Sequence, residues 1–566
     1  MTDSTDKTMI QIQDEPDGDA TVHLIASNNN LQAPILSFVI SSTTEATYFG
    51  QLNSPAMWLN RTAQKRFDPA AIESLHRIER NEMNNSAFFR LSQYHRANLL
   101  VERRESVLSA PMTRPPSGSR WQIASAAEVS EFMQLPPTGY SIGHIAGIKT
   151  REGGKIEMRL TGEILSHHML SAGQTGSGKS NTNVNIIGAA QATGFCSLVY
   201  DMKPDYSEID QPNDELLPPG VIPEGFRNVT YWVLGSDQIR PNETAISVPA
   251  CELDPSKLAQ VIFYRPGEDN QQEVCEQLLT GYFINQEEAG RELWTMQDFV
   301  AWLSDASLNP AAAAAAMPFP ATFNAQTFNA VRSKVNRRGR IPSWIDGYVL
   351  GGRIPLGGIL GGLGQPQPNQ NALRLFDQLC PGAIHVIRVR AEGDGRSYAL
   401  FLDYAMRKVA NLRRDESEAT PPILHVIDEA ADLFKAANRR LALAMEGTVD
   451  EQVRKGRSLS IGFVLSSQSA GDIPERIRHN LNSIIVFKHR QPKILTEILP
   501  EMTAETRQLA SRLQRGEALV ELFQTSGLSR CKMRQSPARL FKPDRRAPVE
   551  PVTVATARRT REPVTQ

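Results

Sequence analysis

The sequence has little cysteine and no long hydrophobic segment. Its five cysteines are scattered over 566 residues, and no two of them have the spacing of a metal or redox site. This pattern is typical of a protein in a reducing cytoplasm. No apolar run reaches the roughly eighteen residues that a membrane-spanning helix needs, and the acidic N-terminus is unlike a secretory signal. We therefore expect no membrane span.

The chain also lacks an excess of charge of either sign. Its formal net charge is −1, so it has no overall electrostatic attraction to nucleic acid. Any binding to nucleic acid must come from local basic patches or from a pore that several subunits form. The length allows two to four domains with a large core.

One stretch matches the phosphate-binding pattern G-x-x-x-x-G-K-[ST] and consists of Gly173, Gln174, Thr175, Gly176, Ser177, Gly178, Lys179 and Ser180. The glycines let backbone N–H groups surround a phosphate. Lys179 can reach the β- and γ-phosphates, and Ser180 can hold Mg²⁺. A candidate strand at 169–172 precedes the loop, and a candidate helix at 183–190 follows it. The pattern predicts a nucleoside triphosphate site, and we expect the next residue, Asn181, to belong to it as well.

A second motif is an apolar run at 423–427 that ends in Asp428 and Glu429. It fits the Walker B pattern, in which Asp428 would hold Mg²⁺ and Glu429 would polarise the attacking water. An Asp-Glu pair at a strand end is also a common helix cap, so the pattern gains its meaning from the P-loop. Gln468 ends the next candidate strand. It is either a sensor of the γ-phosphate or a solvated loop side chain.

Other charged groups leave two interpretations open. Arg457, in the basic group 454–457, could stabilise transition-state charge in a neighbouring subunit or lie on a solvated surface. Residues 201–206 could meet the nucleotide crevice or form a polar turn. The basic groups 332–340 and 388–396 could contact a phosphate backbone or solvent.

The periodicity of the chain divides it into four parts. We expect disorder for the acidic residues 1–20, and a β-rich, barrel-like N-terminal domain at 21–165 with a helical stretch at 68–108. Residues 166–540 form the core, with a helical insertion at about 250–345. Residues 541–566 are a Pro-rich, basic tail.

Strands and helices alternate in the core. The candidate strands include 196–201, 229–234, 383–389, 423–427, 462–468 and 483–487. Such alternation predicts the α/β class with a mostly parallel sheet and right-handed crossovers.

Several of these motifs resemble those of one family. The block 168–181 resembles the P-loop of the HerA branch of the HerA/FtsK ATPases, which has a histidine five residues before the first P-loop glycine, here His168. Residues 428–430 are similar to the family's Asp-Glu-Ala Walker B. Residues 201–206 resemble its Asp-Pro-His-Gly-Glu-Tyr, with Asp205 in place of glutamate.

The resemblance covers about 140–525. Gly456 and Arg457, followed by the run that ends in Gln468, resemble the family's Gly-Arg segment and Ser-Gln sensor. Two features depart from the family. His167 stands where many members have a trans-acting arginine, and the first 110 residues match the family's small barrel less clearly.

This resemblance implies a RecA-like P-loop ATPase core, a helical insertion and an N-terminal β-barrel-like domain. It implies ATP and Mg²⁺ as ligands, with Lys179, Glu429 and Gln468 acting in one subunit and Arg457 reaching in from the next. It also implies a cytoplasmic hexameric ring that translocates or unwinds double-stranded DNA. Its partner would be a nuclease or a sirtuin-like effector, in DNA end processing or antiviral defence.

Two other functions stay open. The ring could be an ATP-switched scaffold that activates an effector without translocating. It could also be a conjugation or secretion motor, although the expected absence of a transmembrane segment counts against that alternative.

Overall fold

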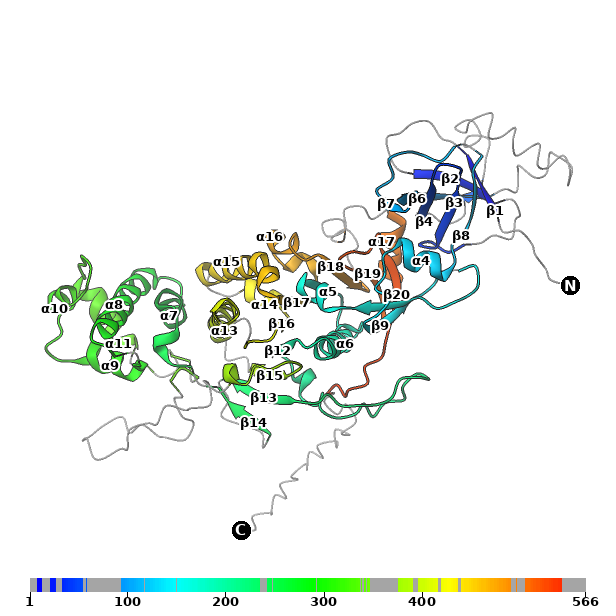
Figure 1. Ribbon diagram of the computed structural model, residues 1–566. Helices are drawn as coiled ribbons and strands as arrows, with labels where there is room; N and C mark the ends of the chain where they lie inside the picture. The colour runs from blue at the N-terminus through cyan, green and yellow to red at the C-terminus, as the bar shows by residue number, and fades with distance from the viewer. Residues whose placement is uncertain are drawn as a thin grey trace, which may run out of the picture.

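The computed structural model describes residues 8–12, 21–26, 33–53, 57–58, 93–116, 118–148, 150–234, 242–246, 248–291, 293–335, 337, 341–342, 344–346, 375–389, 395–415, 419–435, 439–489, 495 and 504–541. A large sheet with helices on both faces forms the centre of the molecule. A small domain of strands lies at one end of it, and a group of helices lies at the other end (Figure 1).

The N-terminal domain consists of antiparallel strands. They are β1 (Thr8–Ile12), β2 (Thr21–Ala26), β3 (Phe38–Ser42), β4 (Thr47–Leu52), β5 (Met57–Trp58), β6 (Gln93–Arg104), β7 (Val107–Ser109) and β8 (Arg120–Ile123). The pairing runs β2-β1-β8-β3-β4-β6, and β2 also pairs with β6. The path therefore closes on itself, which leaves few exposed sheet edges.

Two expectations for this domain need correction. Residues 8–12 are not disordered, because β1 pairs with β2 and β8. The helical stretch expected at 68–108 is wrong over 93–104, which is strand β6. Alternate side chains of β6 (His95, Ala97 and Leu99) are buried, a period of two that the helical assignment overlooked. Residues 68–92 lie outside the described part of the chain.

Twelve strands among the described residues form the central sheet. They are β9 (Tyr140–Ile145), β10 (Glu157–Leu160), β11 (Met169–Ala172), β12 (Cys196–Asp201), β13 (Val229–Leu234), β14 (Glu243–Ala245), β15 (Ile384–Val389), β16 (Ile423–Ile427), β17 (Ile461–Ser467), β18 (Ser483–Phe487), β19 (Glu517–Glu521) and β20 (Ser529–Met533). Their order is β10-β9-β20-β19-β18-β11-β17-β16-β12-β15-β13-β14. The strands from β18 to β14 are parallel, and those from β19 to β10 are antiparallel.

The antiparallel strands β9 and β10 at the edge of the central sheet change the domain boundary that the sequence predicted at residue 165. Residues 140–160 do form the expected hairpin, β9 and β10. However, β9 pairs with β20, where Ile145 lies opposite Cys531. This hairpin thus belongs to the central sheet and not to the N-terminal domain. A partner almost 400 residues away along the chain cannot be found from local periodicity.

Helices cover both faces of the sheet and form the group at its far end. They are α4 (Ala126–Phe132), α5 (Gly162–Ser166), α6 (Lys179–Ala192), α7 (Pro255–Ile262), α8 (Asp269–Glu288), α9 (Met296–Ser304), α10 (Pro310–Ala315), α11 (Ala325–Val335), α13 (Arg396–Asp415), α14 (Ala431–Phe434), α15 (Arg439–Gly456), α16 (Glu475–Arg478) and α17 (Ala504–Arg512). In the part of the chain with described coordinates, none of them has both the length and the apolar character to cross a bilayer.

The strands at the centre of the sheet bury both faces. In β12, Leu198 and Tyr200 pack into the core on the side of α13 and α15, whereas Val199 packs into the core on the side of α6. Such strands are continuous apolar runs because neither face meets water. Helices α7 to α11 lie in the stretch for which the sequence predicts a helical insertion (Figure 1).

Close packing of α5 on β17 predicts the effect of a single methyl group. A Cβ added to Gly462 of β17 would lie 2.2 Å from the Leu165 backbone oxygen in α5. We expect Gly462→Ala to destabilise the core by about 1–3 kcal/mol. A Cβ on Gly447 in α15 meets nothing within 4 Å, so Gly447→Ala should stabilise by about 0.5–1 kcal/mol. Thermal melting of both variants tests this, and equal shifts would contradict it.

Candidate nucleotide site

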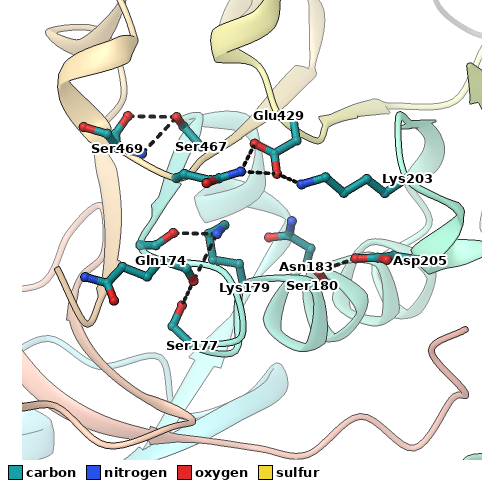
Figure 2. A network of polar contacts seen from close by, with 12 residues as sticks. Gln174, Ser177, Lys179, Ser180, Asn183, Lys203, Asp205, Glu429, Ser467 and Ser469 are labelled. Atoms are coloured by element: carbon teal, nitrogen blue, oxygen red, sulfur yellow. Dashed lines mark hydrogen bonds and ion pairs between the residues drawn. The ribbon is translucent and has the colours of Figure 1, made fainter. Parts of the chain in front are cut away.

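Four neighbouring parallel strands bring the predicted site residues together. In the order β11-β17-β16-β12, each strand ends at the same edge of the sheet. The P-loop follows β11, Gln468 follows β17, Asp428 and Glu429 follow β16, and the turn 201–206 follows β12. Polar side chains at the carboxyl ends of adjacent parallel strands share one crevice. The segments far apart in the sequence therefore form one site (Figure 2).

The P-loop is a tight turn between β11 and α6. Gly173 has φ 153°, and a Cβ there would lie 2.6 Å from the Cβ of Phe487, so the position requires glycine. Gly178, at the start of α6, has φ 125°. Thr175 and Gly176 are exposed at the tip of the loop, and Ser177 donates a hydrogen bond to the Gln174 oxygen at 2.6 Å. The stretch thus forms a tight, glycine-dependent turn between a strand and a helix, the shape that a phosphate loop requires.

Lys179 is buried and points back into the loop. Its Nζ donates to the carbonyl oxygen of Gly173 at 2.5 Å and lies 3.4 Å from that of Gln174. Burial lowers the pKa of Lys179, while the charges of Glu429 and Asp428 act in the opposite direction. The ammonium is therefore held at the loop, where the resemblance places phosphate.

The residues predicted to hold Mg²⁺ supply oxygen ligands. The Ser180 hydroxyl donates to Asp205 at 2.8 Å. Asp428 is almost fully buried, and this burial, followed by the charges of Glu429 and Asp205, raises its pKa to about 6. A divalent cation would offset this crowding of negative charge, and hydroxyl and carboxylate oxygens are the ligands that Mg²⁺ prefers. Ser180 and Asp428 thus fit the ion, with Asp205 beside them.

Two side chains, those of Gln468 and Lys203, hold the carboxylate of Glu429 in place. Gln468 Nε2 lies 3.1 Å and 3.2 Å from its two carboxylate oxygens, and Lys203 forms an ion pair with Oε1. Burial acts to raise the pKa of Glu429, but the hydrogen bonds from Lys203 and Gln468 outweigh it, and the pKa is lowered. Glu429 also has φ 48°, a left-handed conformation that is uncommon for a residue with a side chain.

The turn 201–206 is both a polar turn and a wall of the site, so the two interpretations of the sequence hold together. Asp201 is buried and accepts the backbone N–H of Tyr206 at 3.2 Å. Burial raises the pKa of Asp201 well above its usual range. Asn183 of α6 donates to the Tyr206 hydroxyl at 3.0 Å. Together with Ser180 and Asp205, this contact ties the turn to the P-loop helix.

The Asn181 side chain points away from this crevice. Its Nδ2 donates to the Arg534 oxygen at 2.8 Å, and its Oδ1 accepts the Ser536 N–H at 2.8 Å. Asn181 therefore fastens the segment after β20 to α6. At this position the backbone of Asn181, and not its side chain, is available to contact a nucleotide.

Arg457 lies at the opposite edge of the sheet. It is exposed in the short 3-10 helix Arg457–Leu459, before β17, whereas Gln468 follows β17. The strand between them spans about 20 Å, more than an arginine side chain can cross. Neighbouring Arg454 and Lys455 form ion pairs with Asp450 and Glu451 within α15. The structure thus separates Arg457 from the other predicted catalytic residues of its own chain.

His167 lies near Arg457 but is buried. Its ring stacks on Phe523 with centroids 3.4 Å apart, and the Arg457 guanidinium is 6.0 Å from the same ring. The His167 ring therefore packs inside its own subunit and does not project outward as a second arginine finger would.

The two other basic groups contact their own chain. Arg332 donates to the backbone oxygens of Ser304 and Asp305, and Arg388 pairs with Glu243. The Arg396 guanidinium lies 3.2 Å from the centroid of the Tyr264 ring. The described side chains of these groups thus have structural partners.

Lys203 and Asp205 lie in the stretch 201–206, for which the sequence left a place in the crevice and a polar turn both open and predicted no individual roles. The stretch follows a buried strand, and residues in that position face the crevice of a parallel sheet, which is the signal for both side chains.

The P-loop, the acidic pair and the polar residue after the next strand define this molecule as a P-loop ATPase. Residues 140–317 match the family model described as the central domain of the helicase HerA. The chain is 22% identical over 462 residues to the DNA double-strand break repair helicase HerA of Sulfurisphaera tokodaii, covering 80% of each chain. It is 20% identical over 471 residues to that of Sulfolobus acidocaldarius, covering 79% of each.

Solved structures include more distant neighbours. The bacterial conjugative coupling protein TrwB is 15% identical, with a TM-score of 0.45, over 77% of this chain and 96% of the other. VirB4 of Thermoanaerobacter pseudethanolicus is 12% identical, with a TM-score of 0.45, over 71% of this chain and 98% of the other. The family match and the two curated relatives support a HerA-like ATPase, an enzyme that hydrolyses ATP.

The position of Lys179 predicts its contribution. Lys179→Ala removes the cation at the phosphate loop, so ATP hydrolysis should fall by about a hundredfold or more. Phosphate release measures this. The matched control is Lys435→Ala, because Lys435 is an exposed lysine paired with Asp472 at 2.9 Å. Full hydrolysis by the Lys179→Ala variant would show that the P-loop is not part of the active site.

Proposed function

We propose that this protein is the motor subunit of a hexameric ring that uses ATP hydrolysis to translocate or unwind double-stranded DNA. In this proposal ATP binds between subunits. One subunit contributes Lys179, Ser180, Asp428, Glu429 and Gln468, and the next contributes Arg457. The ring acts in the cytoplasm with a separate nuclease or sirtuin-like effector, in DNA end processing or antiviral defence.

The observation that carries the proposal is the position of Arg457. It is exposed, and the part of the chain that is described offers it no carboxylate partner. It lies at the amino end of β17, while Gln468 and Glu429 lie at the carboxyl edge of the sheet. Repetition of one heterologous contact would place the amino edge of one subunit against the carboxyl edge of the next, and such a contact forms a ring when its rotation closes.

The proposed chemistry assigns one task to each group. The loop and Lys179 hold the phosphates, while Ser180 and Asp428 hold Mg²⁺, which neutralises charge on the β- and γ-phosphates. Glu429 accepts a proton from the water that attacks the γ-phosphorus. The bond between this phosphorus and the β–γ bridging oxygen breaks, and ADP and phosphate leave. Arg457 stabilises the charge that develops in this step.

We propose DNA as the polymer along which the ring moves because of what the relatives are named. Both curated proteins are named as DNA double-strand break repair helicases, and each aligns with about four fifths of this chain. The proposed cytoplasmic location accords with the cysteines, because all five lie in the described part of the chain and none of them forms a disulfide bond there. The partner follows only from the resemblance to HerA proteins.

A mixing experiment tests the shared site. Lys179→Ala and Arg457→Ala should each abolish hydrolysis. Mixed rings made from equal amounts of both should recover about a quarter of the wild-type rate, because a random heterologous contact pairs an intact loop with an intact arginine in one of about four cases. Native mass spectrometry verifies that mixed rings form. Mixed rings without activity would show that the two residues do not act across one interface.

Movement on DNA distinguishes a motor from an ATP-switched scaffold. We expect ATP-dependent strand displacement or displacement of a bound block from a long duplex, and we expect Glu429→Gln to lose both while still binding ATP. The readout is gel-resolved displacement beside phosphate release on the same DNA. Hydrolysis without displacement would favour the scaffold.

A further inference from the structure

Lys203 is a second lysine in the nucleotide crevice, and the hydrolysis scheme above gives it no role. It follows β12, two residues after Asp201, and its ammonium pairs with Glu429, the residue proposed to activate water (Figure 2). The Lys203 side chain is 46% exposed, whereas that of Glu429 is 12% exposed. The pair thus joins a half-exposed, flexible side chain to a nearly buried one.

The backbone that carries Lys203 is fixed relative to the phosphate loop. On its C-terminal side, Asp205 accepts the Ser180 hydroxyl at 2.8 Å, and Tyr206 accepts Asn183 at 3.0 Å. Both contacts join the turn to α6, whose first residue is Lys179. The position of Lys203 is therefore set by the P-loop helix, while its long side chain can rotate.

Lys203 lies among the charged groups that surround the P-loop. Its ammonium interacts electrostatically with that of Lys179, as well as with Asp428 and Glu429. Figure 2 shows Lys203 directed at Glu429, and Lys179 directed back into the P-loop, so the two lysines border the same crevice. Two cations that converge beside a metal-binding acidic pair are suited to an anion with several oxygens.

The pairing with Lys203 conflicts with the role of Glu429. Gln468 is hydrogen-bonded to both oxygens of Glu429, and Lys203 occupies Oε1 as well. A carboxylate that accepts the proton of an attacking water needs an oxygen directed at that water. The ion pair with Lys203 occupies part of the accepting capacity of Glu429 and lowers the pKa of its carboxyl, so release of Lys203 would make Glu429 a better proton acceptor.

We propose that Lys203 exchanges Glu429 for the γ-phosphate of ATP, so that one movement both binds the γ-phosphate and frees the carboxylate for water. Lys203 is then a ligand of ATP that discriminates it from ADP, and the ion pair is its resting position. The proposal rests on nucleotide binding at the P-loop. It does not depend on a ring or on movement along DNA.

Selective binding of the γ-phosphate gives the first test. Lys203→Ala should weaken binding of the slowly hydrolysed analogue ATPγS by about tenfold, on the scale of one charge-assisted hydrogen bond, and leave ADP binding unchanged. Lys203→Arg should retain most of the discrimination. Calorimetry with Mg²⁺ and no DNA measures both affinities. Lys435→Ala, at another exposed lysine that forms an ion pair, should change neither affinity.

A double-mutant cycle tests the exchange of partners. Glu429→Gln removes the resting partner of Lys203 by neutralising it, so ATPγS should bind more tightly than to the wild type. This gain should disappear when Lys203→Ala is added. A structural role for Lys203 predicts no such coupling, because it would affect ADP and ATPγS alike.

Three results would overturn the proposal. Equal loss of ATPγS and ADP binding in Lys203→Ala would reduce Lys203 to a structural residue. Faster hydrolysis with unchanged discrimination would make it only a restraint on Glu429. Additive effects of Glu429→Gln and Lys203→Ala on ATPγS binding would show that Lys203 does not exchange Glu429 for the γ-phosphate. Loss of DNA translocation with intact discrimination concerns the proposed function instead, so the two failures can be distinguished.

Discussion

The direction of the four central strands is the constraint on which the rest of the structure depends. Because β11, β17, β16 and β12 are parallel neighbours, every polar residue after a strand lies at one edge, and every residue before a strand lies at the other. The P-loop, Glu429 and Gln468 share the first edge, and His167 and Arg457 share the second. One backbone arrangement thus brings most of the candidate site residues together and separates Arg457 from them.

The crevice concentrates charge in a partly dry environment. Asp201 and Asp428 are buried, and burial raises the pKa of both. Lys179 is buried as well, and burial lowers its pKa. Ionised groups in such surroundings are stabilised by nearby opposite charges, so a metal cation and a polyphosphate fit a site that already contains unbalanced charges of both signs. Lys203, the most exposed of the charged groups discussed in the crevice, is the one that can move.

Much of the core could be predicted from the sequence, because its strands are buried on both faces and read as continuous apolar runs. The strands at 196–201, 423–427 and 483–487, and the acidic pair after the second of them, follow directly from this pattern. The rest depends on long-range pairing. Strand β6 alternates weakly and finds its partners in β2 and β4, and β9 joins the sheet through β20. The bond between Lys203 and Glu429 joins two turns 226 residues apart, so no local pattern contains it.

Helix α15 connects the two edges of the sheet. It follows the acidic pair through α14 and ends at Gly456, next to Arg457. Near its middle, Thr448 donates to buried Asp403 of α13 at 2.9 Å, and Lys257 of α7 forms an ion pair with the same carboxylate. A buried carboxylate on one helix with partners on two others fixes the relative positions of all three, since loss of the cationic partner leaves its charge without compensation. The helical insertion is thus attached to the element that links Glu429 with Arg457.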